Sequence, residues 1–303
     1  MKSINQYITE KLKISKSSVS PNNYFPETKE ELKEILEQLI EKRGNKGNFN
    51  DIDTSEITDM SELFKDMEYF NGNISKWDVS KVTNMRSMFS NCQVFNKDIS
   101  KWDVSNVKNM ECMFLGCKLF NKPLNDWNVS NVTNMYAMFV HCKKFDQPLD
   151  KWNVSNVTDM SSMFFDCIKF NQPLDKWDVS NVTNMKHMFA NCSKFNQDIS
   201  VWDVSNVTDM FSMFAICKSF NQPLNNWDVS NVTDMFSMFE LCDLFNQPLN
   251  DWNVSNVKDM GIMFKNCKSF NQDLSNWKVS NVTNNKDIFY GCPIEEKNKP
   301  NFK

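Results

Sequence analysis

Hydrophobic residues recur along this chain at a fixed interval of 25 positions. All nine tryptophans, Trp77 to Trp277, follow that step, and so do nine of the ten cysteines, Cys92 to Cys292. No insertion or deletion interrupts the interval between about residue 49 and residue 292. A regular period of roughly 20 to 50 residues indicates a stack of structural repeats.

One unit, starting at Leu124, reads LNDWNVSNVTNMYAMFVHCKKFDQP, and we number its positions as places 1 to 25. Apolar residues hold places 1, 4, 6, 9, 12, 15, 16, 19 and 22. A unit of this size cannot bury that many apolar side chains alone, but stacked copies can, which is the principle of a solenoid. Ten units fit the chain, and they start at Phe49, Ile74, Ile99, Leu124, Leu149, Leu174, Ile199, Leu224, Leu249 and Leu274.

Within each unit the pattern predicts a short parallel strand followed by a short helix. Places 4 and 6 are apolar between polar neighbours, which is the period of a strand, and places 9, 12, 15, 16 and 19 follow a helical stripe. Ser or Thr at places 7 and 10 and Asn or Asp at place 11 are candidate helix caps. Strands stacked in this way would lie about 4.8 Å apart. The expected fold class is therefore an α/β repeat solenoid of about ten coils.

The chain divides into four expected segments. Residues 1–27 form an amphipathic peptide and a linker, residues 28–48 a capping helix and turn, residues 49–292 the solenoid, and residues 293–303 a polar tail. In the second segment, Thr28 and Glu31 have the spacing of a capping box, and Gly44 follows the last helical position. Because a solenoid needs a lid on its open end, we expect this helix to cover the first coil.

The first sixteen residues contain a second amphipathic pattern. Its apolar members would share one helical face, and they are Ile4, Tyr7, Ile8 and Leu12. One interpretation is a docking peptide on a linker, and the other is a short helix that packs back onto the cap. The same stretch lacks the apolar run of a secretory signal and any cysteine for lipid attachment, so the sequence by itself favours a cytoplasmic or virion-associated protein.

Charge and composition exclude several classes of function. The net charge of −4 argues against a generic nucleic-acid binder, and no apolar run is long enough to span a membrane. The two histidines, His141 and His187, fall in different columns of different units, and no Walker, GxGxxG or HExxH motif is present. We therefore expect a non-enzymatic protein with no cofactor and no catalytic or metal site. One cysteine per unit favours a column of small buried side chains over a zinc site.

The repeat pattern W-D/N-V-S-N-V-T-N/D-M-x-x-M-F-x-x-C-x-x-F-N-Q-P-L resembles the BspA-like leucine-rich repeat family. This 25-residue type also occurs in mycoplasma surface lipoproteins. The resemblance covers residues 49 to 292, and it implies a leucine-rich-repeat-like fold without enzymatic activity. Because better-known members are surface adhesins that bind host proteins, it also implies a protein partner and a place on the cell surface.

Binding is expected at the places that the core does not fix. A few of these hold large apolar side chains for which packing gives no reason, and the candidates are Tyr136, Phe165, Phe211, Phe236 and Leu241. Phe211 and Phe236 would stack in adjacent coils, although place 13 could also be partly buried. Two functions stay open: a protein-binding or adhesive solenoid, and a structural component of a larger assembly, such as a virion or a stacked array, joined through the N-terminal peptide.

Overall fold

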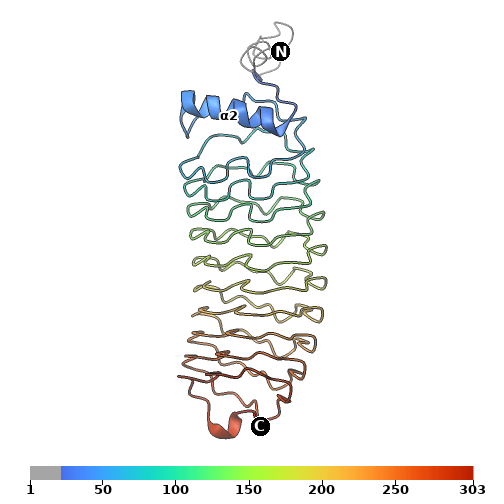
Figure 1. Ribbon diagram of the computed structural model, residues 1–303, viewed down its shortest axis with the longest axis vertical. Coiled ribbons are helices and arrows are strands. Elements are labelled where there is room, and N and C mark those ends of the chain that lie inside the picture. The colour runs from blue at the N-terminus through green and yellow to red at the C-terminus, as the bar shows by residue number, and fades with distance from the viewer. Residues whose placement is uncertain (1–21, 303) are drawn as a thin grey trace.

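Ten stacked coils make up almost the whole molecule in the computed structural model, which describes residues 22–302 (Figure 1). The helices of that range are α2, Lys29–Arg43, and the short 3-10 helix η1, Glu296–Asn298. The solenoid predicted from the 25-residue period is therefore confirmed. The candidate docking residues Ile4, Tyr7, Ile8 and Leu12 lie outside the described residues.

The repeated apolar places form continuous columns in the core. The tryptophans are between 2% and 5% exposed, and the phenylalanines at place 16 are fully buried except in the last coil. Each tryptophan Nε1 donates to the place-1 carbonyl of the preceding coil, as Trp152 does to Leu124 at 2.9 Å. Each of the eight buried cysteine thiols, from Cys92 to Cys267, donates likewise to a place-16 carbonyl, as Cys167 does to Phe139 at 3.0 Å. The polar atoms of the tryptophan and cysteine columns therefore form their hydrogen bonds inside the core.

The strand and helix expected inside each coil are not found. In residues 49–292 there is no helix, and every parallel bridge between two of the ten coils falls at place 11, from Asp59 to Asn284, instead of places 4 and 6. Two more bridges of the described range lie at its N-terminal end, where Tyr24 pairs with Ile52 and Asn48 with Asn73. N–H groups at places 12, 14, 16 and 18 donate to carbonyls of the next coil, for example from Ser162 to Lys186 at 2.7 Å. We call the surface formed by places 11 to 18 the ladder face.

Two left-handed residues per coil explain why no helix forms. Places 14 and 18 have positive φ in every coil, for example 57° at Ser162 and 61° at Asp166. Each closes a tight turn, with Met163 donating to the Met160 carbonyl and Cys167 to that of Phe164. Because a left-handed residue turns its neighbouring N–H groups outward, they bond to the next coil and not to the residue four positions back. Consecutive turns reproduce the apolar spacing of a helix.

The distance between equivalent rings of adjacent coils differs from column to column. Equivalent rings lie 6.4 Å apart in the tryptophan pair Trp152–Trp177 and 5.7 Å apart at place 16, between Phe139 and Phe164. On the ladder face, Phe211 and Phe236 are 5.1 Å apart. Stacked rings in adjacent coils are therefore spaced by 5.1 to 6.4 Å in these three pairs, depending on the column.

Helix α2 lies across the N-terminal end of the stack (Figure 1). Thr28 Oγ1 accepts from the Glu31 N–H at 3.2 Å, and the Gly44 N–H donates to the Ile40 carbonyl at 2.8 Å, so both ends are capped. The buried face of the helix joins the core of the coils through Leu32, Leu36 and Leu39. Lys29 Nζ donates to Ser61 Oγ at 2.7 Å, which places the start of α2 at the ladder side of the first coil.

Candidate binding surface on the ladder face

The five side chains singled out from the sequence all lie on the ladder face. Tyr136, Phe211 and Phe236 occupy place 13, Phe165 place 17 and Leu241 place 18. Tyr136 is 40% exposed, and the other four are half-buried. Phe211 and Phe236 at place 13 are therefore partly buried, and the stacking expected of them is found, with ring planes 17° apart.

Three of these side chains, Phe165, Phe211 and Phe236, form a row with His141 and His187 that crosses five coils. His141 contacts Phe165 at 5.5 Å, Phe165 contacts His187 at 5.9 Å, and His187 contacts Phe211 at 4.9 Å, each edge to face. The Phe211–Phe236 stack completes this aromatic row. Sequence columns separate the two histidines, whereas the turn geometry places one on each side of Phe165. Knowledge that places 13, 14, 17 and 18 share one face would have revealed the row.

His187 is the polar member at the centre of the aromatic row. Burial, with Lys186 beside it, lowers the pKa of His187 below its usual range, so the imidazole is neutral at pH 7. Its Nδ1 is buried and has no hydrogen-bond partner among residues 22–302. Lys186 Nζ lies 4.4 Å from the centre of the Phe211 ring, which is a cation–π contact. The aromatic row therefore presents apolar rings together with one imidazole nitrogen, His187 Nδ1, that has no hydrogen-bond partner within residues 22–302.

Coils seven and eight carry the most apolar part of the ladder face. Ile216 and Leu241 hold place 18 of the two coils that supply the Phe211–Phe236 pair, and both are half-buried. Their φ angles of 65° and 59° are left-handed, a region that branched apolar side chains rarely adopt. Most other coils have Asn, Asp or Gly at this place. Strain of this kind persists where the surrounding structure imposes it and is concentrated at functional sites.

A row of carboxylates borders this apolar part. Asp209, Asp234 and Asp259 occupy place 11 of three successive coils. One oxygen of each accepts from the N–H two residues later, at 2.8 to 2.9 Å. Burial raises the pKa of Asp234, and the two neighbouring carboxylates raise it further. The candidate helix caps of the sequence are therefore turn-forming residues, and they leave negative charge beside the aromatic pair.

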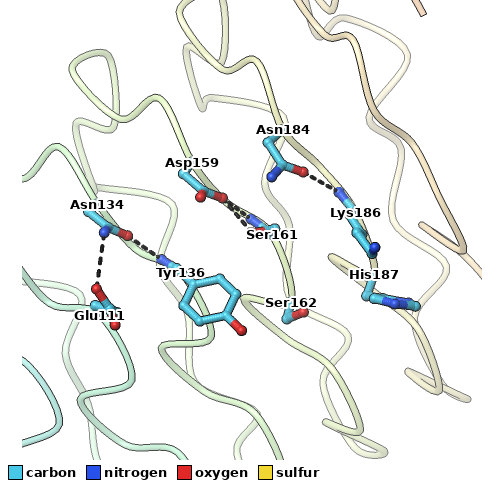
Figure 2. Close-up of a pocket in the computed structure, with 9 residues that line it drawn as sticks. All are labelled: Glu111, Asn134, Tyr136, Asp159, Ser161, Ser162, Asn184, Lys186 and His187. Carbon is cyan, nitrogen blue, oxygen red and sulfur yellow. Dashed lines mark hydrogen bonds between the residues drawn. The ribbon is translucent and has the colours of Figure 1, made fainter. Parts of the chain in front are cut away.

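A hollow opens beside His187, at the middle of the aromatic row (Figure 2). Its volume is about 480 Å³, and the small side chains of Ser161 and Ser162 leave space between Tyr136 and His187. Tyr136 points across the next coil toward Ser162 (Figure 2). The complete lining consists of Glu111, Asn134, Tyr136, Asp159, Ser161, Ser162, Asn184, Lys186 and His187. The hollow is therefore lined mainly by polar side chains, with Tyr136 and His187 as its two rings.

The cysteine column lies behind this face and is inert by burial. Eight of the ten thiols are buried, as the packing interpretation predicts, and Cys112 and Cys292 are half-buried. Burial raises the pKa of the stacked thiols well above 9.0, and that of Cys112 to about 11. In the described part of the chain, no three His, Cys, Asp or Glu side chains group in a way that could hold a metal ion. Nor is any helix of that part long and apolar enough to cross a bilayer.

These features define a tandem-repeat solenoid with an aromatic surface on its hydrogen-bonded face. The chain belongs to the family described as "Mycoplasma protein of unknown function, DUF285", whose model matches residues 31–149, 119–216 and 198–302. No curated protein matches the chain. Among solved structures it is similar to a chain of the "Crystal structure of TLR13-ssRNA13 complex", with 10% identity and a TM-score of 0.30. That alignment covers 75% of this chain and 39% of the other, and nothing about a ligand follows from it.

Proposed function

We propose that this protein is a non-enzymatic solenoid that binds a protein partner through the ladder face of coils seven and eight. The observation that supports the proposal most directly is that two adjacent coils hold four half-buried apolar side chains on this face, namely the stacked pair Phe211 and Phe236 together with Ile216 and Leu241. The core does not require these side chains, because other coils fold with Ser, Lys, Asn or Gly at the same places. Aromatic side chains on an otherwise polar surface are typical of the centre of a protein interface.

A binding experiment with matched variants tests this proposal. The variant Phe211→Asp/Phe236→Asp places two carboxylates on the ladder face. The control Val201→Asp/Leu244→Asp adds the same charge in the same two coils, at side chains that are 69% and 55% exposed and lie off that face. Immobilised proteins of equal melting temperature would be exposed to extract of the source cells. We expect one protein to be enriched by the wild type and by the control, and to be lost with the phenylalanine variant.

A partner retained equally by all three proteins would contradict the proposal, and so would the absence of any enriched protein. If the phenylalanine variant melts earlier than the control, Phe211→Ser/Phe236→Ser replaces it. Serine already occupies place 13 at Ser161, so the coil accepts it there.

Adhesion is the finer role that we propose for this binding, and it implies a place on the cell surface. It is supported by the resemblance of the repeats to the BspA-like type. Protease treatment of intact source cells provides the test, because a surface protein is cleaved while a cytoplasmic marker stays intact. Full protection of this protein would leave the binding proposal standing and remove adhesion.

The alternative role, as a component of a stacked array, finds no support in the ends of the ladder. At the last coil the N–H groups of Asp287, Phe289 and Gly291 have no acceptor within residues 22–302. A second copy could continue the ladder only with the carbonyls of its own first coil, where α2 is packed. If the C-terminal ends of two copies met, N–H donors would face N–H donors, and no hydrogen bonds could form between them.

A further inference from the structure

A second surface of the solenoid, separate from the ladder face, is a corner formed by places 20 and 21. In coils three to seven this corner has ten positions, of which six are lysine and none is acidic. All six are exposed, and they are Lys118, Lys143, Lys144, Lys169, Lys194 and Lys218. We call this row the lysine edge. It is a concentration of positive charge on a chain whose net charge is −4.

Most of this charge is not compensated locally. Lys144, Lys169, Lys194 and Lys218 form no ion pair with any residue of the described range, while Lys143 lies 3.4 Å from Asp166. By contrast, two of the lysines at place 3 form ion pairs. There Lys151 pairs with Asp126 at 2.8 Å and Lys176 with Asp150 at 3.1 Å. The lysine edge therefore has the charge to attract an anionic partner.

The spacing of the lysine edge matches a linear partner. Phenylalanines at place 22, next to the edge, are 6.0 to 6.1 Å apart from coil to coil between Phe120 and Phe220. In an extended polypeptide, alternate side chains on one side are about 6.7 Å apart, and flexible lysines can absorb the difference. Four coil steps correspond to about eight residues of extended chain. Because the lysine edge is only two places wide in each coil, its positive charges form a line and not a broad patch.

The side chains between the lysines favour a polypeptide over other linear polyanions. Leu119, which is 45% exposed, and the half-buried Ile168 interrupt the row. An acidic peptide carries apolar side chains that can contact them, whereas a sulfated glycan does not. Single-stranded nucleic acid is bound by aromatic side chains on which bases stack, and these ten positions have none. We propose that the lysine edge binds an extended acidic segment of a protein.

The test uses a fluorescent peptide of about twelve residues with Glu at alternate positions. The variant Lys144→Gln/Lys169→Gln/Lys194→Gln removes three charges from the edge. The control Lys76→Gln/Lys101→Gln/Lys176→Gln removes three exposed lysines at place 3, so both variants have the same net charge. At low ionic strength we expect the edge variant to bind the peptide about tenfold more weakly than the wild type, and the control to bind within about twofold.

Three results would overturn the proposal. One is the absence of peptide binding by the wild type at low ionic strength. Another is an equal loss in the two variants, which would show that only net charge matters. The third is binding of heparin or oligothymidylate that depends on the three lysines while peptide binding does not. Because no residue of the ladder face enters this experiment, its failure leaves the proposed function untouched.

Discussion

The backbone path of each coil depends on the conformation of single residues, and place 18 is an example. Its left-handed conformation suits residues with little or no side-chain conflict. Seven of ten coils meet this need, with Asp66, Asn91, Gly116, Asp166, Asn191, Asn266 and Gly291. His141, Ile216 and Leu241 are the exceptions, and all three lie on the aromatic row or beside it. The fold tolerates them at a cost, so function is the better reason for their presence.

Replacing Ile216 with asparagine tests this cost. Asn occupies the left-handed region with less conflict, so Ile216→Asn should stabilise the protein by about 1 kcal/mol. The same change at Ile168, which is half-buried but not left-handed, should give no gain. Urea denaturation of both variants measures the difference, and a loss of stability in Ile216→Asn would contradict the strain argument. Partner binding should weaken in Ile216→Asn even though the fold is more stable.

Asparagine at place 23 acts through one side-chain oxygen. Asn196 Oδ1 accepts from the Asn221 N–H at 2.9 Å and from Gln222 Nε2 at 3.0 Å. Place-23 side chains therefore form a half-buried row of hydrogen bonds from coil to coil, which we call the place-23 ladder. Asn196→Ala leaves these two donors without an acceptor, and we expect a loss of roughly 1–3 kcal/mol.

Asn226→Ala is the matched control, because that side chain is exposed and accepts nothing within residues 22–302. Its free energy of unfolding should stay within about 0.5 kcal/mol of the wild type in the same urea titration. Equal stability of Asn196→Ala and Asn226→Ala would remove the place-23 ladder as a source of stability.

At the scale of the element, the sequence predicts which residues are buried but not the path between them. The columns of Trp77, Phe89 and Cys92 follow from the period alone, because any stacked arrangement must bury what repeats. The helix expected between places 9 and 19 is wrong. Two consecutive turns bring the same places inward as a helix does, and hydrophobic periodicity cannot distinguish the two. The frequent Asn, Asp and Gly at place 18 is the sequence signal that could have done so.

Because of the cysteine column, the free energy of unfolding should decrease as the pH rises into the alkaline range. Each buried thiol has its pKa raised above 9.0, so the unfolded chain loses protons first as the pH rises. The stabilisation is complete below about pH 9 and is lost above it, by about 1.4 kcal/mol per pH unit for each thiol.

Unfolding free energies measured from pH 8 to about pH 10.5 test this dependence. The variant Cys142→Ala/Cys167→Ala lacks two of the eight buried thiols, so its slope should be shallower by about 3 kcal/mol per pH unit. The variant is less stable at pH 8 because of its cavities, but the slope does not depend on that offset. Parallel slopes for the variant and the wild type would show that the thiols do not titrate on unfolding.

For the whole molecule, stability is a sum over neighbouring coils. Removing residues 149–173 takes out one entire coil and joins Pro148 to Leu174, a Pro–Leu junction like the one it replaces. We expect this protein to fold, with buried tryptophans and a moderately lower melting temperature. Removing residues 149–172 shifts every later column by one position and should expose the tryptophans that follow. Tryptophan emission measures both, and equal behaviour of the two deletions would contradict a register-based core.

The direction of the ladder bonds gives the rod an electrical polarity. Four N–H rows point toward the C-terminal coil and one, at place 10, points back, so peptide dipoles of about 3.5 D add along the axis. The positive end lies at the free N–H groups of Asp287, Phe289 and Gly291, and the negative end at the first coil. Lys29 stands at that negative end, 3.8 Å from Asp59. This is the reverse of an α-helix, whose N-terminus is positive, and it favours an orientation of the rod with its last coil toward an anionic surface.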